Sequence, residues 1–304
     1  MKVTAACPPC MVHRAYKEIC YATRDPELRL KTMIEVIRLL ARELRPEAVP
    51  AIVGTLRDRL IKRMTGNPDP YKVMKELSNR EALRLLPWAE RYVGEADDDF
   101  GRFRRASLCA IVGNAMEFDI LGHEFRVEDL SGLLERAEQS LAIDELKAIY
   151  ELAGEAESVL YLTDNAGEIA FDVLLVRELK RLGARVVVAV KEEPCINDAL
   201  LEDARAVGMD SEADELITTG TDTVGLVLEW ASPECLRAYE EADLVVAKGM
   251  GNIETLTEYE HAKPIAFLLY TKCETIASHL GVERGKCVAK LWRPSSRNAY
   301  TPHL

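Results

Sequence analysis

The segment LTDNAGE at positions 162–168 places an aspartate beside an asparagine directly after an apolar run. The chain holds only seven Asn and one Gln against 51 acidic and 39 basic residues, so amide side chains are not its general surface groups. Asp164, Asn165 and the later Asp198 together offer two carboxylates and an amide carbonyl. Mg²⁺ and Mn²⁺ prefer such an all-oxygen set of ligands. We therefore predict these three residues as the ligands of a divalent metal ion.

The same residues also have a purely structural interpretation. Asp164 could cap the helix that follows it and Asn165 could form a turn, since both are common uses of these residue types. Asp198 favours the metal site, because a second acid at the end of a neighbouring strand is harder to explain as a helix cap.

The residues around the predicted metal ligands could bind an anion. Gly167, at the start of a helix, would leave backbone amides open to a ligand, and the helix dipole favours a negative charge there. Lys248, within KGMGN, would place a cation near the same anion. Together these features indicate a phosphate pocket. The residues predicted to contact the substrate or its phosphate are Gly167, Glu168, Gly220, Thr221, Asp222, Asn252 and Asn114.

Two common kinds of nucleotide site are disfavoured by these segments. TDNAGE lacks the glycine fingerprint of a dinucleotide site, and KGMGN has a single G-x-G without the third glycine. No P-loop pattern ending in glycine-lysine-serine or glycine-lysine-threonine occurs, which argues against a mononucleotide kinase.

The elements that must position these side chains change character near residue 155. In the first half the apolar period is helical, and Met33, Ile37, Leu40 and Leu44 form one stripe of an amphipathic helix. Proline is tolerated in the first turn of a helix. The prolines placed where a new helix could begin are Pro26, Pro46 and Pro70.

After about residue 156, short apolar runs alternate with helical segments: SVLYLT, ARVVVAV, DELITT, DLVVAK, PIAFLLY and KCVAKLW. Buried parallel strands have this appearance. We predict an α/β fold, a three-layer α/β/α sandwich with a mostly parallel sheet plus an N-terminal helical subdomain. The helical subdomain would cover residues 1–155, and a Rossmann-like domain at 156–304 would carry the metal and phosphate site at the carboxyl ends of its strands.

Composition narrows the class of protein. The net charge of −12 is mixed along the chain, which argues against nucleic acid as a partner. Few amides and many charged residues are typical of a heat-adapted protein. The sequence has no apolar run long enough to span a membrane, and its start does not resemble a signal peptide, so we expect a cytoplasmic location. The oligomeric state is left open.

Cys7 and Cys10 form a CxxC motif near the N-terminus. Such a pair can be a redox couple, half of a second metal site, or two inert buried thiols. Cys273 or Cys287 could complete a set of four thiol ligands only if the two ends of the chain meet. The sequence leaves these alternatives open.

The motifs LTDNAGE, INDALLEDARAVG and VVAKGMGN, in this order, follow a helical half that contains CPPC and IVGN. In this combination the chain resembles the metal-dependent damage-control phosphatase family, long known only as a domain of unknown function. The resemblance covers essentially the whole chain. It implies that Asp164, Asn165 and Asp198 hold the ion and that Lys248 contacts phosphate. The family tends to carry Asp three residues after the Asn of GN, where this chain has Glu117 after Asn114.

The resemblance implies hydrolysis of small sugar phosphates or damaged phosphometabolites with Mn²⁺, Mg²⁺, Ni²⁺ or Co²⁺. The metal would activate a water, Asp198 would orient or deprotonate that water, and Lys248 would stabilise the phosphate oxygens. A covalent phospho-aspartate is the alternative route. The competing functions are an S-adenosylmethionine-dependent carboxyl methyltransferase, which members of the family have also been proposed to be, and a non-catalytic, metal-dependent binding protein.

Overall fold

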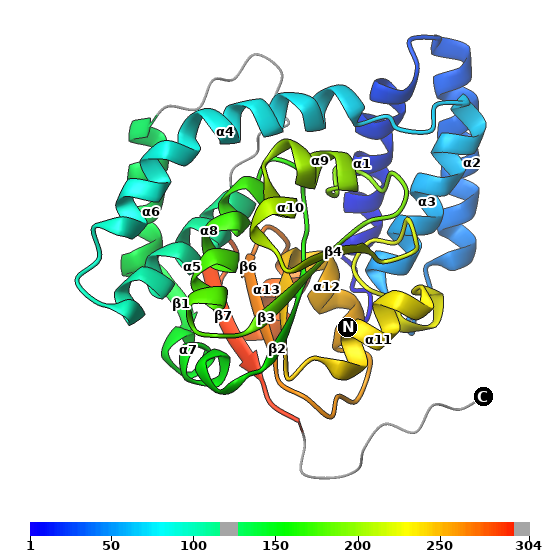
Figure 1. The fold of residues 1–304 in the computed structure, drawn as a ribbon. Coiled ribbons are helices and arrows are strands. Elements are labelled where there is room, and N and C mark those ends of the chain that lie inside the picture. The colour runs from blue at the N-terminus through cyan, green and yellow to red at the C-terminus, as the bar shows by residue number, and fades with distance from the viewer. Residues whose placement is uncertain (116–126, 295–304) are drawn as a thin grey trace.

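The computed structural model describes residues 1–115 and 127–294, and its centre is a seven-stranded sheet in the order β1-β7-β6-β5-β2-β3-β4 (Figure 1). Neighbouring strands are parallel except β6 and β7, which are antiparallel. The strands are β1 (Leu141–Asp144), β2 (Ser158–Leu162), β3 (Arg185–Val190), β4 (Glu215–Thr218), β5 (Leu244–Lys248), β6 (Ile265–Tyr270) and β7 (Cys287–Trp292). All six strands predicted from apolar runs are therefore present.

Both faces of the sheet are covered by helices. Along β2, Val159 and Tyr161 belong to one apolar core, while Leu160 and Leu162 belong to a second core on the opposite face. This two-residue alternation places a helical layer on each side, as predicted for a three-layer sandwich. The sandwich helices are α5 (Asp99–Ala115), α6 (Val127–Ser140), α7 (Leu146–Glu155), α8 (Ile169–Arg181), α9 (Leu201–Ala206), α10 (Met209–Glu212), α11 (Pro233–Glu241), α12 (Gly249–Leu256) and α13 (Glu274–Leu280).

Three N-terminal helices form a bundle with an apolar core of its own. They are α1 (Cys7–Ala22), α2 (Pro26–Glu43) and α3 (Pro50–Thr65), and Figure 1 shows them to one side of the sandwich. The long helix α4 (Lys72–Gly94) runs from this bundle across to α6 (Figure 1). The bundle therefore has a core that does not depend on the sheet.

The helical half differs in detail from the prediction. Pro26 begins α2 as expected, with Asp25 accepting hydrogen bonds from the first-turn amides, but α3 begins at Pro50 and not at Pro46. The predicted stripe on α2 is also rotated, because Ile37 is half exposed whereas Val36 is fully buried. Strand β1, at the edge of the sheet, lies before residue 155 and was not predicted.

A buried hydrogen bond joins α1 to α3. Arg57 donates to Glu18 Oε2 at 3.2 Å, and both side chains are buried. Burial raises the pKa of Glu18 to about 8, and the attraction of Arg57 offsets only part of that effect. The folded chain therefore holds a proton on Glu18 at neutral pH that the unfolded chain does not hold.

We expect this proton to make stability depend on pH. Between the ordinary pKa of 4.5 and about 8, only the folded chain keeps Glu18 protonated, so the free energy of unfolding should fall as pH rises. The slope is up to about 1.4 kcal/mol per pH unit. Glu18→Gln should flatten this fall in urea unfolding measured across the window. The exposed Glu47→Gln is the control, and equal slopes in the two variants would contradict the assignment.

Candidate active site

The polar cluster lies where the order of the strands reverses. From β2 the chain proceeds through β3 and β4 on one side, and it then returns to place β5 and β6 on the other side. Open α/β sheets bind ligands in the crevice that such a switch point creates at the carboxyl ends of the strands. Asp164 follows β2, and Gly249 follows β5, so these two residues lie on the two sides of the crevice.

The three predicted metal ligands lie side by side. Asn165 and Asp198 form an antiparallel bridge between the loops that follow β2 and β3. The Ala199 amide donates to the Asp164 carbonyl at 2.8 Å, and the Ala166 amide donates to the Asn197 carbonyl at 2.9 Å. Backbone hydrogen bonds thus hold the two loops together, and the side chains are positioned by the sheet itself.

Two asparagines fix the orientation of the carboxylates. The side-chain amides of Asn114, at the end of α5, and Asn165 both donate to Asp164 Oδ2, at 2.8 and 2.7 Å. Both also donate to Glu168 Oε2 at 2.8 Å. Because the Asn165 amide group is used in this way, its Oδ1 points away from the two acids. In the described part of the chain, neither Asp164 Oδ1 nor Asn165 Oδ1 has a hydrogen-bond partner, so both remain available as ligands.

The cluster carries more negative charge than its surroundings neutralise. Burial raises the pKa of Asp164 well above its ordinary value, and the charges of Glu168 and Asp198 raise it further. Burial likewise raises the pKa of Asp198 to about 6, although Lys191, 3.6 Å away, partly offsets the effect. A divalent cation would relieve this repulsion, and the two carboxylates and one amide oxygen match a hard ion. The residues present therefore fit the predicted metal.

Lys248 has partners other than the expected phosphate. Its ammonium is fully buried and donates to Ala110 O at 3.0 Å, Glu168 Oε1 at 3.1 Å and Asp172 Oδ1 at 2.6 Å. These three bonds use all the donors of an ammonium group. Although burial opposes it, attraction by Asp172 and Glu168 raises the pKa of Lys248. In this arrangement the Lys248 ammonium holds the Glu168 carboxylate by a hydrogen bond and does not face a ligand.

Glu168 itself accepts hydrogen bonds from both asparagines and from Lys248 and is almost fully buried. We therefore expect it to orient the metal ligands and not to bind substrate. Glu168→Gln replaces a carboxylate oxygen that accepts hydrogen bonds by an NH₂ group, which would face the donors of Asn114, Asn165 or Lys248. Metal affinity should therefore fall about 10- to 100-fold, as it does when residues that hydrogen-bond to a metal ligand are changed. Titration calorimetry of the stripped protein with Mn²⁺ would measure this. An unchanged affinity for Mn²⁺ would contradict this role and favour the earlier prediction that Glu168 binds substrate.

The backbone amide of Gly167 is not open to an anion, contrary to the prediction. It donates at 2.8 Å to Oδ1 of Asn79, which reaches in from α4. The predicted substrate residue Asn252 also has other partners, because its side chain donates to the carbonyls of Thr163 and Lys248. The side chain of Asn252 thus ties the end of β2 to the end of β5.

The segment after β4 is directed toward the helical bundle. Asp222, predicted to touch substrate, accepts a hydrogen bond from Arg59 at 2.9 Å and lies 3.3 Å from the Lys62 ammonium. Burial opposes it, but these two cations lower the pKa of Asp222. Gly220 packs against Ser232, and the carbonyl of Thr221 accepts a bond from the Glu192 amide. In the described structure none of these three residues contacts Asp164.

Helix α3 clamps the loop that carries Asp198. Lys62 donates to the carbonyl of Pro194 at 2.5 Å and pairs with Asp58 at 2.8 Å. Asp58 also accepts a hydrogen bond from the Ile196 amide at 3.4 Å. Ile196 has a φ of 49°, a left-handed conformation that β-branched residues rarely adopt. The strain at Ile196 thus lies within the loop that positions the predicted ligand.

One cation at the site was missed by the sequence reading. Lys272 follows β6, the strand beside β5, and it is partly buried. Its positive charge acts to lower the pKa of Asp164, which places it near the cluster. No ion pair of Lys272 occurs within residues 1–115 and 127–294, so this ammonium differs from that of Lys248 in being unused. Reading the end of β6 in the same way as the other strand ends would have found it.

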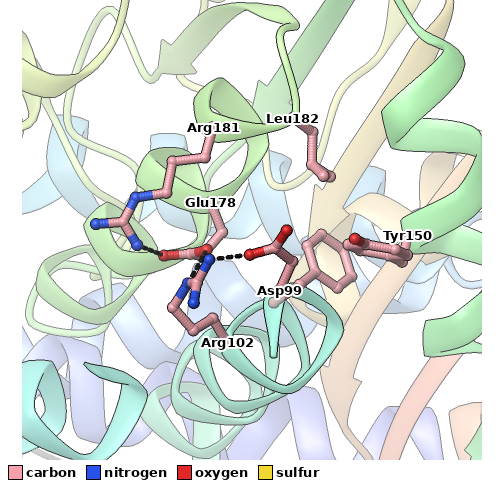
Figure 2. Close-up of a pocket in the computed structure, with 7 residues that line it drawn as sticks. Asp99, Arg102, Tyr150, Glu178, Arg181 and Leu182 are labelled. Carbon is pink, nitrogen blue, oxygen red and sulfur yellow. Dashed lines mark hydrogen bonds and ion pairs between the residues drawn. The ribbon is translucent and has the colours of Figure 1, made fainter. Parts of the chain in front are cut away.

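A hollow of about 180 Å³ lies away from this cluster, at the opposite ends of α5 and α8. Figure 2 shows Arg102 and Arg181 both directed at the carboxylate of Glu178, with Asp99 also paired to Arg102. The acids and bases in this hollow satisfy one another. Its lining residues are Asp99, Arg102, Phe103, Tyr150, Glu178, Arg181 and Leu182. We assign no catalytic role to them.

Two sequence-based questions concern residues outside the site. Glu117 lies outside the described residues. Cys7 is buried, Cys10 is exposed, and both are free thiols. Across the described ranges no group of three or more His, Cys, Asp or Glu side chains could hold a metal ion, so the CxxC pair has no third ligand there.

None of the described helices is long and apolar enough to cross a membrane.

The fold is an α/β/α sandwich with carboxylates and amides gathered at a switch point of the sheet. Residues 3–288 match the family described as the damage-control phosphatase ARMT1-like domain. A damage-control phosphatase of Archaeoglobus fulgidus is 38% identical over 292 residues, which cover 96% of this chain and 99% of that protein. A crystal structure of a DUF89 family protein from Pyrococcus horikoshii is 36% identical with a TM-score of 0.86, covering 97% of this chain and 100% of that one. The chain therefore belongs to the damage-control phosphatase ARMT1-like family.

Family membership confirms the predicted resemblance, the α/β fold and the assignment to the phosphatases. The family is generally metal-dependent. The choice of metal and the roles of individual residues stay predictions.

Proposed function

We propose that this protein is a divalent-metal-dependent phosphatase that hydrolyses a small phosphorylated metabolite in the cytoplasm. The observation that carries the proposal is the cluster of Asp164, Asn165 and Asp198, in which two ligand oxygens have no hydrogen-bond partner among the described residues. The nearby lysines offset only part of the mutual repulsion of its carboxylates. Family membership supports the same reaction class.

Asp164, Asn165 and Asp198 would hold the metal, which is Mn²⁺, Mg²⁺, Ni²⁺ or Co²⁺ in this proposal. When bound, the ion supplies Lewis-acid neutralisation of phosphate charge and activates water at neutral pH. Asn165 contributes a neutral oxygen, so the site repels a phosphate less than three carboxylates would. Asp164 Oδ2 and Glu168 Oε2 accept hydrogen bonds from the side-chain amide of Asn165 and so keep its NH₂ group turned away from the ligand position.

The remaining steps belong to side chains of the chain itself. Asp198, which lies beside Asn165 in the predicted metal site, is our candidate to orient the attacking water or to accept its proton. Lys272 is placed to bind the phosphate oxygens, because it is the cation near Asp164 whose donors are unused in the described structure. Lys248 holds Glu168 and so acts through it.

We expect Lys272→Met to lower kcat/KM for a phosphate ester about 10- to 100-fold, the loss of one charged hydrogen bond. Lys248→Met should instead weaken metal binding, since the hydrogen bonds of the Lys248 ammonium within the described residues go to Glu168, Asp172 and a backbone carbonyl. Steady-state kinetics at saturating metal, beside the exposed Lys17→Met as control, would separate the two lysines. A larger catalytic effect of Lys248→Met at saturating metal would return the phosphate role to that residue.

The function is tested by phosphate release from a panel of sugar phosphates and an aryl phosphate. Protein stripped with a chelator would be assayed with each of the four metals added back. Release that requires metal supports the proposal and ranks the substrates. If well-folded protein releases no phosphate with any metal, the hydrolase proposal fails, and binding of S-adenosylmethionine becomes the next measurement.

A further inference from the structure

The CxxC motif has the geometry of a disulfide site. Cys7 is the first residue of α1, and Cys10 follows one helical turn later. Residues three apart in an α-helix have Cα atoms about 5 Å apart, which lies within the range that a disulfide spans. The two intervening residues are Pro8 and Pro9, whose rings fix φ at a helical value. The helical backbone thus places the two Cα atoms at a separation that a disulfide can span.

The two thiols have different surroundings. Cys10 is exposed and accessible to a reagent in solution, whereas Cys7 is buried. The sulfur of Cys7 accepts from the Thr4 amide at 3.3 Å and lies 3.6 Å from the hydroxyl of Thr275. Thr4 and Thr275 are themselves hydrogen-bonded at 2.7 Å. In the reduced protein, Cys7 therefore attaches the start of α1 to the start of α13.

The segment on which Cys7 packs leads directly into the site. Thr275 lies in the first turn of α13, and Lys272 lies just before that helix, after β6. A change at Cys7 can therefore loosen the turn that carries Lys272. The consequence for catalysis rests on the proposed function, whereas the disulfide itself does not.

We propose that Cys7 and Cys10 are a reversible redox site whose oxidation lowers the activity of the enzyme. An oxidised low-molecular-weight disulfide, such as glutathione disulfide, is the oxidant. The Cys10 thiolate attacks it, forms a mixed disulfide and releases one thiol. Cys7 then attacks the Cys10 sulfur, the Cys7–Cys10 bond forms, and the second thiol leaves. Two protein thiols lose two protons and two electrons, and one glutathione disulfide becomes two thiols.

Oxidation removes the Cys7 sulfur from its contact with Thr275, because Cys10 faces solvent while Thr275 is buried. The expected result is a fall in kcat/KM of about fivefold, corresponding to the loss of one ordinary hydrogen bond at the turn.

The test equilibrates the metal-loaded protein with glutathione mixtures of increasing oxidation, traps free thiols by alkylation and digests with trypsin. Cleavage after Lys2 and Arg14 releases residues 3–14, which contain both cysteines and no others. We expect a single transition to a peptide two hydrogens lighter, together with increased hydrogen exchange in α13. The activity should fall with the same midpoint and recover on reduction.

Matched variants separate this site from the other thiols. Cys20→Ser, in the same helix but outside the motif, should behave as wild type, whereas Cys10→Ser should lose both the mass transition and the fall in activity. Three results would overturn the proposal: a glutathione adduct that persists on Cys10, a zinc ion bound by the purified protein through Cys7 and Cys10, or a disulfide that leaves activity unchanged. If no substrate is hydrolysed at all, the mass transition still tests the disulfide, so the two failures are distinguishable.

Discussion

Asp164→Ala is expected to abolish phosphate release, with a fall of about a thousandfold or more at any metal concentration, equivalent to about 4 kcal/mol. Asp164 accepts hydrogen bonds from both asparagine amides through Oδ2, which leaves Oδ1 as the predicted ligand of the ion. The variant removes this predicted ligand and also removes one acceptor from each of the two amides, including that of Asn165. The effect should therefore exceed that of losing one ligand among several independent ones.

Unfolding should not be the cause of this loss. Burial and two neighbouring acids raise the pKa of Asp164, so its charge is unfavourable in the metal-free fold, and alanine relieves that repulsion. Each of the two asparagine amides loses one hydrogen bond but keeps Glu168 as an acceptor. We expect the stripped variant to melt within a few degrees of stripped wild type. Wild type should gain about 2.7 kcal/mol from metal at a hundred times its Kd, and the variant should gain nothing.

The exposed Asp97→Ala serves as the control for this comparison, since it removes an acid far from the cluster. Calorimetric melting with and without Mn²⁺, beside the phosphate assay, gives both readouts. If Asp164→Ala keeps the metal-induced stabilisation and turns over like Asp97→Ala, the assignment of the metal site is wrong.

The proximity of Asp164, Asn165 and Asp198 could be predicted from the sequence because it depends on simple rules. Runs of Val, Ile and Leu identify buried strands, and parallel strands bring their carboxyl ends to one edge of a sheet. Asp164 and Asp198 follow two adjacent strands, so their proximity needs no knowledge of side-chain packing. Asn165, Gly167 and Glu168 come directly after Asp164, so the same rule places them at the end of β2.

The role of Lys248 depends on packing that the strand rule does not describe. Lys248 turns inward because it donates to the buried carboxylate of Asp172, which also accepts a hydrogen bond from Tyr161. Asp172 lies in the first turn of α8, four residues after the N-cap residue Glu168. One signal was present: Asp172 interrupts the apolar run IAFDVLLV, and a buried acid of this kind needs a partner. Lys248, at the end of a neighbouring strand, was the candidate for that partner.

The edge strand of the sheet, the buried face of α2 and the partner of the Gly167 amide were harder to predict, because each depends on a neighbouring element. Strand β1 has only four residues, and it is a strand because β7 lies beside it. The buried face of α2 includes Thr32 and Val36, since the bundle selects which side of the helix it covers, and the apolar stripe alone does not decide this. Asn79, whose side chain accepts the hydrogen bond of the Gly167 amide, comes from α4, a helix that no local sequence pattern connects with the site.

Gly249→Ala is expected to lower phosphate release about a hundredfold although it removes no functional group. Gly249 begins α12 with a φ of 74°, and a Cβ atom built there would overlap the carboxylate of Asp164. The carboxylate would have to move by about an ångström, which is enough to cost a factor of this size at a reacting centre. Metal affinity should fall together with activity.

Gly281→Ala is the matched control for this prediction. Gly281 has a φ of 69°, so alanine meets the same left-handed backbone strain, about 1–2 kcal/mol, but a Cβ atom there has no neighbour within 4 Å. Both variants should therefore lose a similar part of their free energy of urea unfolding, and only Gly249→Ala should lose Mn²⁺ affinity and turnover. Equal losses of activity in the two variants would mean that backbone strain is the cause. Full activity of Gly249→Ala would show that Asp164 does not need the position that the structure gives it, and the metal site built around that carboxylate would then have to be abandoned.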